Sequence, residues 1–121
     1  MSFEVEPNES ECYVLVRHTG DTTVGDMNAA RYVVKQYLER NNWEKILADV
    51  REANPKFLQT EHFQFVTTHK SELPEGIKIA VVSHPTHTAL TTFAENVASQ
   101  WEISLRGFVD EREAIDWLIG T

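Results

Sequence analysis

The feature that most constrains the fold is a short apolar run, Ile46, Leu47, Ala48 and Val50, which is interrupted and followed by charged residues. Such a run is typical of a β-strand that is covered on both faces, as in a parallel sheet between helices. Asp49 and residues 51–52 place charge at its C-terminal end. In parallel α/β sheets, ligands and partners are usually bound at that end. The run therefore predicts both an α/β fold and the region of a site.

The rest of the chain alternates between strand and helix patterns. Thr23 and Asp26 have the spacing of a capping box, which predicts that a helix begins there, and Thr60 is the expected cap of the next helix. Residues 17–21 read as a loop, and residues 53–55 are expected to end the buried strand. The predicted strands cover residues 3–6, 12–16, 45–52, 77–82 and 103–108, and the predicted helices cover residues 23–40, 58–70, 86–101 and 110–119.

This order predicts one α/β domain over residues 1–121. After an N-terminal hairpin strand come four strand-helix units, and crossovers between parallel strands are nearly always right-handed. We expect a mostly parallel five-stranded sheet whose antiparallel N-terminal strand lies at an edge. The last strand alternates apolar and polar residues, so we place it near the other edge.

Charge and length exclude several classes of function. Nineteen acidic residues against eleven basic ones give a net charge of −8, which repels nucleic acid. No apolar stretch approaches the roughly 20 residues of a membrane span, and the N-terminus lacks signal-peptide features. We therefore expect a cytoplasmic protein without membrane insertion. Cys12 is the single cysteine and precedes the apolar residues 13–16, so we expect a buried, unreactive thiol.

Three stretches resemble one known family. They are Gly20 with residues 23–26 (TVGD), residues 47–51 (LADVR) and residues 108–118 (FVDEREAIDWL). The chain resembles the SpoIIAA-like proteins of the STAS and Sec14 fold group, which implies a bacterial protein built as a right-handed superhelix of four strand-helix units.

The same resemblance raises the question of a phosphorylation switch. Family members include anti-sigma-factor antagonists, which are phosphorylated on a serine in an Asp-Ser-Ser-Gly type of turn before the second helix. Here residues 57–62 read FLQTEH, and Thr60 is the only hydroxyl near that place. The sequence departs from the antagonist pattern, so we do not carry the switch over to this chain.

Charged residues at the predicted strand ends form the first candidate site. Arg17, Arg51 and Arg106 all fall there, with Asp49 nearby. They form either a mutual salt-bridge network or a pocket for a small carboxylate or phosphate ligand. The sequence leaves both interpretations open.

The loop from His84 to His87 is the second candidate. Together with Asp49, the two imidazoles have the composition of a metal site, but histidines in loops serve more often as caps, so we predict no metal. Thr86 begins a predicted helix, whose end either binds an anion or is capped by Thr86 itself. Ser83, His84 and Asp49 are the residue types of a catalytic triad, but adjacent strand residues point to opposite faces. We therefore predict no catalytic residues.

The second predicted helix is unusually aromatic, with Phe57, Phe63 and Phe65 on more than one face. This pattern predicts an apolar groove or a surface for self-association. His62 and His69 share a helix face, either as part of a pH-sensitive or ligand-lined groove or as fringe of the core.

From these patterns we expect a non-enzymatic STAS-like binding or regulatory module that acts through protein contacts, as a homodimer, and needs no cofactor. The alternative is a small-molecule or lipid carrier that uses the aromatic helix as a wall. A metal-dependent or hydrolytic enzyme ranks third.

Overall fold

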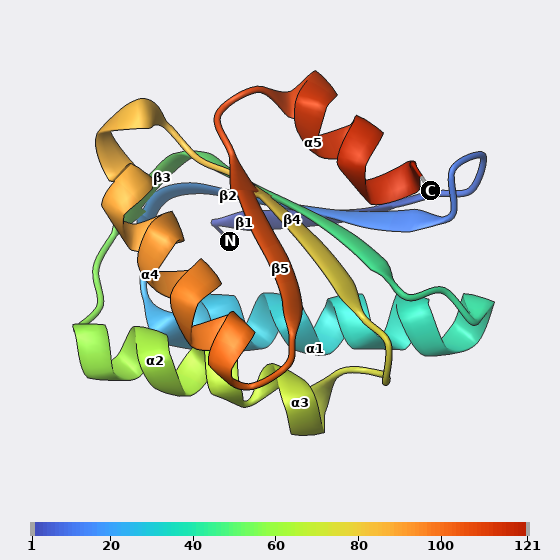
Figure 1. Cartoon of the computed structure of the whole chain (residues 1–121), viewed down its shortest axis with the longest axis horizontal. Coiled ribbons are helices and arrows are strands. Elements are labelled where there is room, and N and C mark those ends of the chain that lie inside the picture. Colours follow the sequence, from blue (N-terminus) through green and yellow to red (C-terminus); the bar gives the residue numbers. More distant parts are fainter. Residues whose placement is uncertain (1, 121) are drawn as a thin grey trace.

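A twisted five-stranded sheet forms the centre of the molecule, with helices on both sides (Figure 1). The computed structural model describes residues 2–120. The strands lie in the order β1-β2-β3-β4-β5; β1 is antiparallel to β2 and all other pairs are parallel. This confirms the predicted fold class. The elements are β1 (Phe3–Asn8), β2 (Tyr13–Thr22), α1 (Val24–Asn41), β3 (Lys45–Pro55), α2 (Gln59–Thr67), α3 (His69–Glu72), β4 (Lys78–Val82), the 3-10 turn η1 (Pro85–His87), α4 (Thr88–Gln100), β5 (Ser104–Phe108) and α5 (Glu111–Ile119).

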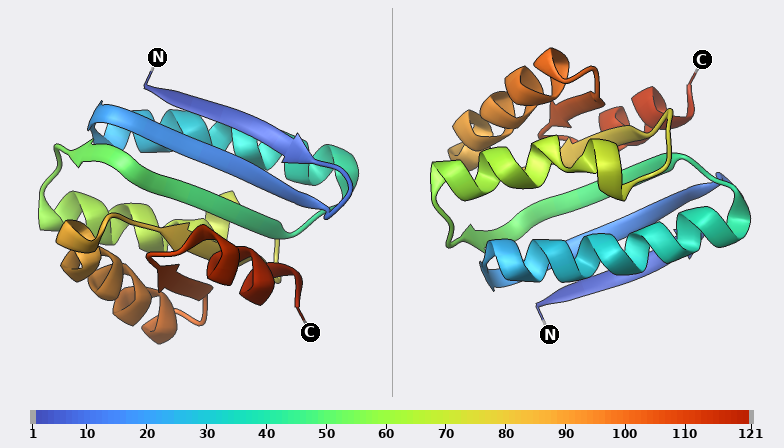
Figure 2. Two further views of the ribbon diagram at one scale, coloured as in Figure 1. Left: turned by 90° about the horizontal axis from the view of Figure 1, so that it is seen from above. Right: turned by 90° about the horizontal axis from the view of Figure 1, so that it is seen from below.

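The two faces of the sheet are covered unequally. Helices α1, α2 and α4 lie on one face, whereas α5 lies on the other, over β3, β4 and β5 (Figures 1 and 2). Alternate residues of each strand point to opposite faces, so each side has its own core. The larger core includes Val14, Val34, Ile46 and Ile79, and the smaller core under α5 includes Leu47. None of the helices between residues 2 and 120 is both long and apolar enough to span a membrane.

Helix α1 begins and ends at the predicted residues. The Thr23 hydroxyl accepts a hydrogen bond from the Asp26 N–H at 3.1 Å, and the Asp26 carboxylate accepts one from the Thr23 N–H at 2.9 Å. This reciprocal pair is the expected capping box. At the other end, Asn42 adopts a left-handed conformation with φ of 59°, which small polar side chains tolerate best.

The strands β2 and β3 are longer than predicted. Residues 17–21 are not a loop, and β3 continues through residues 53–54 to Pro55. After a register shift, residues 19–22 of β2 pair with residues 52–55 of β3. Each strand satisfies the backbone groups of the other, which outweighs the turn-forming composition. Pro55 is tolerated as the last residue of the strand, where its missing donor matters least. Arg17 and Arg51 consequently lie within strands rather than at strand ends.

Three local predictions are wrong. Cys12 is exposed and has φ of 60° in the turn before β2, so it is not a core residue. The second helix is divided into α2 and α3, and its N-cap is Leu58, whose N–H donates to Glu61 at 2.8 Å, rather than Thr60. Helix α4 begins at Thr88 because η1 occupies residues 85–87.

Candidate functional site

A cavity of about 150 Å³, partly open to solvent, lies between the sheet and the helices α1, α2 and α4. It is larger than the voids usual in protein interiors, which seldom exceed a water molecule. Its lining is mostly apolar and comes from four strands, four helices and the connecting segments. The lining residues are Val16, His18, Thr22, Met27, Ala30, Arg31, Val34, Ile46, Ala48, Val50, Ala53, Pro55, Phe57, His62, Phe65, Val66, His69, Leu73, Ile79, Val81, Ser83, His87, Leu90, Thr91, Ala94 and Leu105.

Small side chains on opposing elements explain why this space stays open. Ala30 of α1, Ala48 of β3 and Ala94 of α4 all line it. Ala48 and Val81 lie on the two inner strands under covering helices, yet both retain partial exposure. The short side chains of the alanines therefore leave part of the space between the helices and the sheet unfilled.

Four histidines line the cavity, and burial favours the neutral imidazole in three of them, His18, His62 and His69. Burial lowers the pKa of His62, and burial also lowers the pKa of His18 against the opposing effect of Asp26. Burial, followed by the positive charges of Arg31 and His62, lowers the pKa of His69 to about 3. The buried Nδ1 atoms of His18 and His62 have no hydrogen-bond partner within the described residues. Such an unpaired nitrogen typically costs about 1–3 kcal/mol.

Aromatic rings surround His62. Its imidazole lies 5.0 Å from the ring of Phe57 and 5.3 Å from the ring of Phe93, measured between centroids. The ring of Phe65 makes an edge contact with His69 at 4.8 Å. Phe57, His62, Phe65 and His69 of this group line the cavity, and flat rings pack well against another ring.

Arg31 of α1 brings a guanidinium to the same wall. Its Nη1 donates to the Phe65 carbonyl at 2.8 Å and to the Thr68 hydroxyl at 2.9 Å, and lies 3.1 Å from His69 Nδ1. Its Nη2 donates to Asn28 Oδ1 at 3.0 Å. Burial lowers the pKa of Arg31, whereas the charge of Glu72 acts in the opposite direction.

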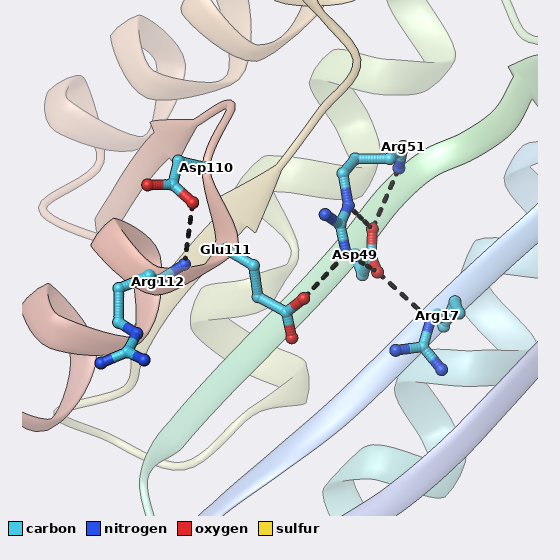
Figure 3. A network of polar contacts seen from close by, with 6 residues as sticks. All are labelled: Arg17, Asp49, Arg51, Asp110, Glu111 and Arg112. Atoms are coloured by element: carbon cyan, nitrogen blue, oxygen red, sulfur yellow. Dashed lines mark hydrogen bonds and ion pairs between the residues drawn. The ribbon is translucent and has the colours of Figure 1, made fainter.

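A second polar cluster lies on the other face of the sheet, under α5 (Figure 3). The Asp49 carboxylate, whose side chain is 5% exposed, accepts from Arg17 Nε at 3.2 Å and from Arg51 Nε and Nη2 at 3.0 and 2.9 Å. Arg51 also pairs with Glu111 of α5 at 2.9 Å. The sequence allowed either a mutual salt-bridge network or a pocket for a small anionic ligand, and this arrangement has the features of the network. Arg106 of β5 is exposed, and its guanidinium lies over the ring of Phe108 at 5.5 Å.

The loop histidines are not assembled with Asp49. His84 is exposed and its Nδ1 accepts from the Thr86 N–H at 3.1 Å, while His87 lines the cavity on the face opposite to Asp49. Ser83 is buried on the cavity side as well, so no Ser-His-Asp arrangement forms. Within residues 2–120, no three potential metal-binding side chains come together.

The aromatic helix is divided between two environments. Phe57 and Phe65 line the cavity. Phe63 is instead 40% exposed, and its ring makes an edge contact with Trp101 at a centroid distance of 6.5 Å. His62 and His69 line the cavity, and the ligand-lined alternative for this helix face stays a prediction.

The sequence interpretation missed Arg31 and His18. A signal existed for both, because Arg31 follows Met27 by four residues and precedes Val34 by three, which places it beside the inward stripe of α1. His18 continues the alternation of Val14 and Val16 toward the same face of β2. Polar residues within an apolar stripe are rare enough to mark a site.

The fold is shared with solved structures of known proteins. No protein-family model and no curated protein matches this sequence. The anti-sigma factor antagonist SpoIIAA in its unphosphorylated form superimposes with a TM-score of 0.62 at 16% identity, over 98% of this chain and 99% of the other. The chain has a SpoIIAA-like fold. A DUF3478-family protein from Shewanella loihica PV-4, described as uncharacterized and SpoIIAA-like in fold, gives 0.61 at 17% identity, over 96% and 91%.

This SpoIIAA-like fold confirms the resemblance at the level of architecture. Thr60 lies in the first turn of α2 and is exposed. It is followed by Glu61, whose carboxylate is engaged by the Leu58 N–H. A phosphate on Thr60 would stand next to that carboxylate, and the repulsion between them is a further reason not to carry the switch over.

Proposed function

We propose that this protein is a ligand-binding module whose site is the cavity between the sheet and helices α1, α2 and α4. The cavity itself is the observation that supports the proposal, since its lining is apolar and it measures about 150 Å³. Enclosed apolar cavities of about that size bind benzene. The ligand is therefore a small and largely apolar molecule. We assign no reaction to the site.

The volume favours a compact ligand over a long-chain lipid. Sites for drug-sized molecules usually measure roughly 300–1,000 Å³. A space of about 150 Å³ suits a single ring or a short branched chain. Among the carrier alternatives from the sequence, the small molecule is the one that we retain.

Filling the cavity tests this function directly. Ala48 points into the hollow, so Ala48→Leu should occupy it, whereas the neighbouring Ala80 is fully buried under α5 and has no such space. We expect Ala48→Leu to leave the free energy of unfolding unchanged or increase it, and Ala80→Leu to decrease it by about 1–3 kcal/mol through overpacking. Benzene should bind the wild type and Ala80→Leu but not Ala48→Leu. Changes in amide chemical shifts on addition of benzene measure this binding.

Two results would count against the cavity as a ligand site. One is the absence of benzene-induced shifts in the wild type at saturating benzene. The other is a loss of stability in Ala48→Leu as large as that in Ala80→Leu. Native mass spectrometry of freshly purified protein, repeated after denaturation, would also weigh any organic ligand that it retains.

A second candidate function is the protein-contact module expected from the sequence, acting through self-association. Phe63 and Trp101 support it because their side chains are 40% and 45% exposed and their rings make an edge contact. Exposed aromatic residues are typical of interface centres. We place a second copy of the chain on this surface.

Sedimentation velocity over a range of protein concentrations tests this second function. A dimer that dissociates in Phe63→Ser, with unchanged circular dichroism, is the expected result. Tyr32→Ser provides a matched control, because Tyr32 is 63% exposed on α1. A wild-type protein that stays monomeric at high micromolar concentration contradicts self-association and leaves the cavity proposal untouched.

A further inference from the structure

The residues that line the cavity carry permanent charge of only one sign, which is positive. Of the residues that line it, Arg31 carries the one permanent charge, and none is Asp, Glu or Lys. This contrasts with the whole chain, in which nineteen acidic residues outnumber eleven basic ones. A cation beside an apolar space is unfavourable unless something neutralises it. A positive charge in the lining without any acidic side chain there therefore favours an anionic group in the ligand.

The contacts of Arg31 within the described residues are all with neutral groups. They are the Phe65 carbonyl, the Thr68 hydroxyl, the His69 imidazole and the Asn28 amide, and the guanidinium carbon lies 4.6 Å from the centre of the Phe65 ring. Between residues 2 and 120, no carboxylate lies within 4.0 Å of its nitrogens. Its positive charge consequently has no formal counter-charge in direct contact.

Part of that charge is offset by the helix that Arg31 contacts. The Phe65 carbonyl belongs to the last turn of α2, and a helix C-terminus carries a partial charge of about −0.5. A purely structural role as a helix-capping cation would account for these bonds. It would not account for the remaining charge of Arg31, which is partly buried and lines the cavity.

The hydrogen-bonding capacity of Arg31 is also incomplete. A guanidinium has five N–H donors. Nη1 uses its two on the Phe65, Thr68 and His69 acceptors, and Nη2 uses one on Asn28. Nε and the second Nη2 hydrogen have no acceptor within the described residues. Two donors are what one carboxylate accepts from a guanidinium in a bidentate pair.

We propose that the ligand is a small monocarboxylate with an apolar ring, held by its carboxylate at Arg31 and by its ring in the cavity. This inference rests on the proposed function and specifies its ligand class. The rings of Phe57, His62 and Phe65, which line the cavity, receive the ring of the ligand. The unpaired imidazole nitrogens of His18 and His62 lie in the same lining and offer further polar contacts.

The test uses three probes of nearly one shape: benzoate, its uncharged analogue benzamide, and benzene. Affinities are measured at pH 7.5 by isothermal titration calorimetry and by amide chemical shifts. We expect benzoate to bind the wild type about tenfold or more tightly than benzamide, because hydrogen bonds to a charged partner are the strong ones. The comparison needs no variant, so it holds even where a substitution affects folding.

Variants of Arg31 test whether its charge causes the preference for benzoate over benzamide. Arg31→Met should bind benzoate and benzamide equally, and Arg31→Lys should keep part of the preference. Arg40 lies on the same helix but is exposed, with its guanidinium 5.3 Å from the Tyr37 ring, so Arg40→Met is the matched control and should behave as the wild type. Circular dichroism and thermal unfolding verify that each variant is folded.

The outcomes separate this inference from the proposed function. Binding of benzene or benzamide as tight as that of benzoate overturns the carboxylate and leaves the cavity as a site for neutral ligands. An unchanged benzoate preference in folded Arg31→Met overturns the role of Arg31. Absence of binding by all three probes overturns both the inference and the proposed function.

Discussion

At the scale of single residues, Asp49 makes the most concentrated set of polar contacts. Burial acts to raise its pKa, but the hydrogen bonds from Arg51 and Arg17 outweigh this effect, so the pKa of Asp49 lies below its usual value. A carboxyl with a lowered pKa in the folded state stabilises the protein above its unfolded pKa, near 4. That contribution is lost as the pH falls through the folded pKa.

Replacing this carboxylate should therefore lower the free energy of unfolding by an amount that depends on pH. We expect Asp49→Asn to lower the free energy of unfolding by about 2–3 kcal/mol at pH 7, because two charge-assisted contacts lose their charge. Arg17→Gln removes one partly exposed partner and should cost less. Chemical denaturation between pH 7 and pH 2 measures both, and the gap between wild type and Asp49→Asn should narrow below pH 4. A gap that is constant with pH contradicts the assignment.

Gly107 of β5 shows how tightly one residue is constrained. Its N–H donates to the Glu95 carboxylate at 2.6 Å, and a Cβ at this position would overlap with Cγ2 of Thr91. We expect Gly107→Ala to destabilise the protein by about 1–3 kcal/mol, and Thr91→Ser, which removes that methyl group, to recover part of the loss. Gly25→Ala in α1 is the control, since its Cβ would meet only an ordinary contact at 3.5 Å. Additive effects of the two substitutions would contradict the overlap.

At the scale of elements, a capping residue in the sequence predicted the start of a helix correctly only where its side chain forms a hydrogen bond with the backbone. Thr23 and Asp26 form the predicted box at α1. Thr60 has the right residue type, but the chain enters α2 at Leu58, one position before Gln59. An N-cap depends on the direction from which the chain arrives, and the sequence nearby does not contain that information.

The two threonines give a test at this scale. We expect Thr23→Ala to lower the free energy of unfolding by about 1 kcal/mol, because the Asp26 N–H loses its acceptor. Thr60→Ala should change it by less than about 0.5 kcal/mol, as is usual for exposed positions. Urea denaturation of both variants makes the comparison, and equal losses would show that Thr60 also caps a helix.

At the scale of the whole molecule, the buried histidines link stability to pH. Their pKa values are lowered in the folded protein, mainly by burial. Below about pH 6.5 the unfolded chain therefore takes up protons that the folded chain does not. Stability therefore falls as the pH decreases from about 6.5 toward the folded-state pKa of each histidine.

His62→Phe isolates one of these contributions. Its Nδ1 has no partner within residues 2–120, and its ring lies between Phe57 and Phe93, so a phenyl ring should fit. We expect the variant to match the wild type within about 1 kcal/mol at pH 8 and to become relatively more stable as the pH falls below 6.5. Thermal unfolding from pH 8 to pH 4.5 measures the difference. Parallel curves would contradict a lowered pKa for His62.

Sequence patterns alone determined the sheet, the order of its elements, the edge position of β1 and β5, and the ends of α1. These features depend on periodicity and on contacts within a few residues. Only the tertiary structure decided that β2 and β3 continue past their turn-forming residues, that Arg17 and Arg51 meet at Asp49, and that Phe57 and Phe65 face inward while Phe63 does not. The cavity belongs to this second group. It arises because alanines from three separate elements face one another and because Arg31, His18 and His62 come from distant segments, and no local pattern records distances between segments.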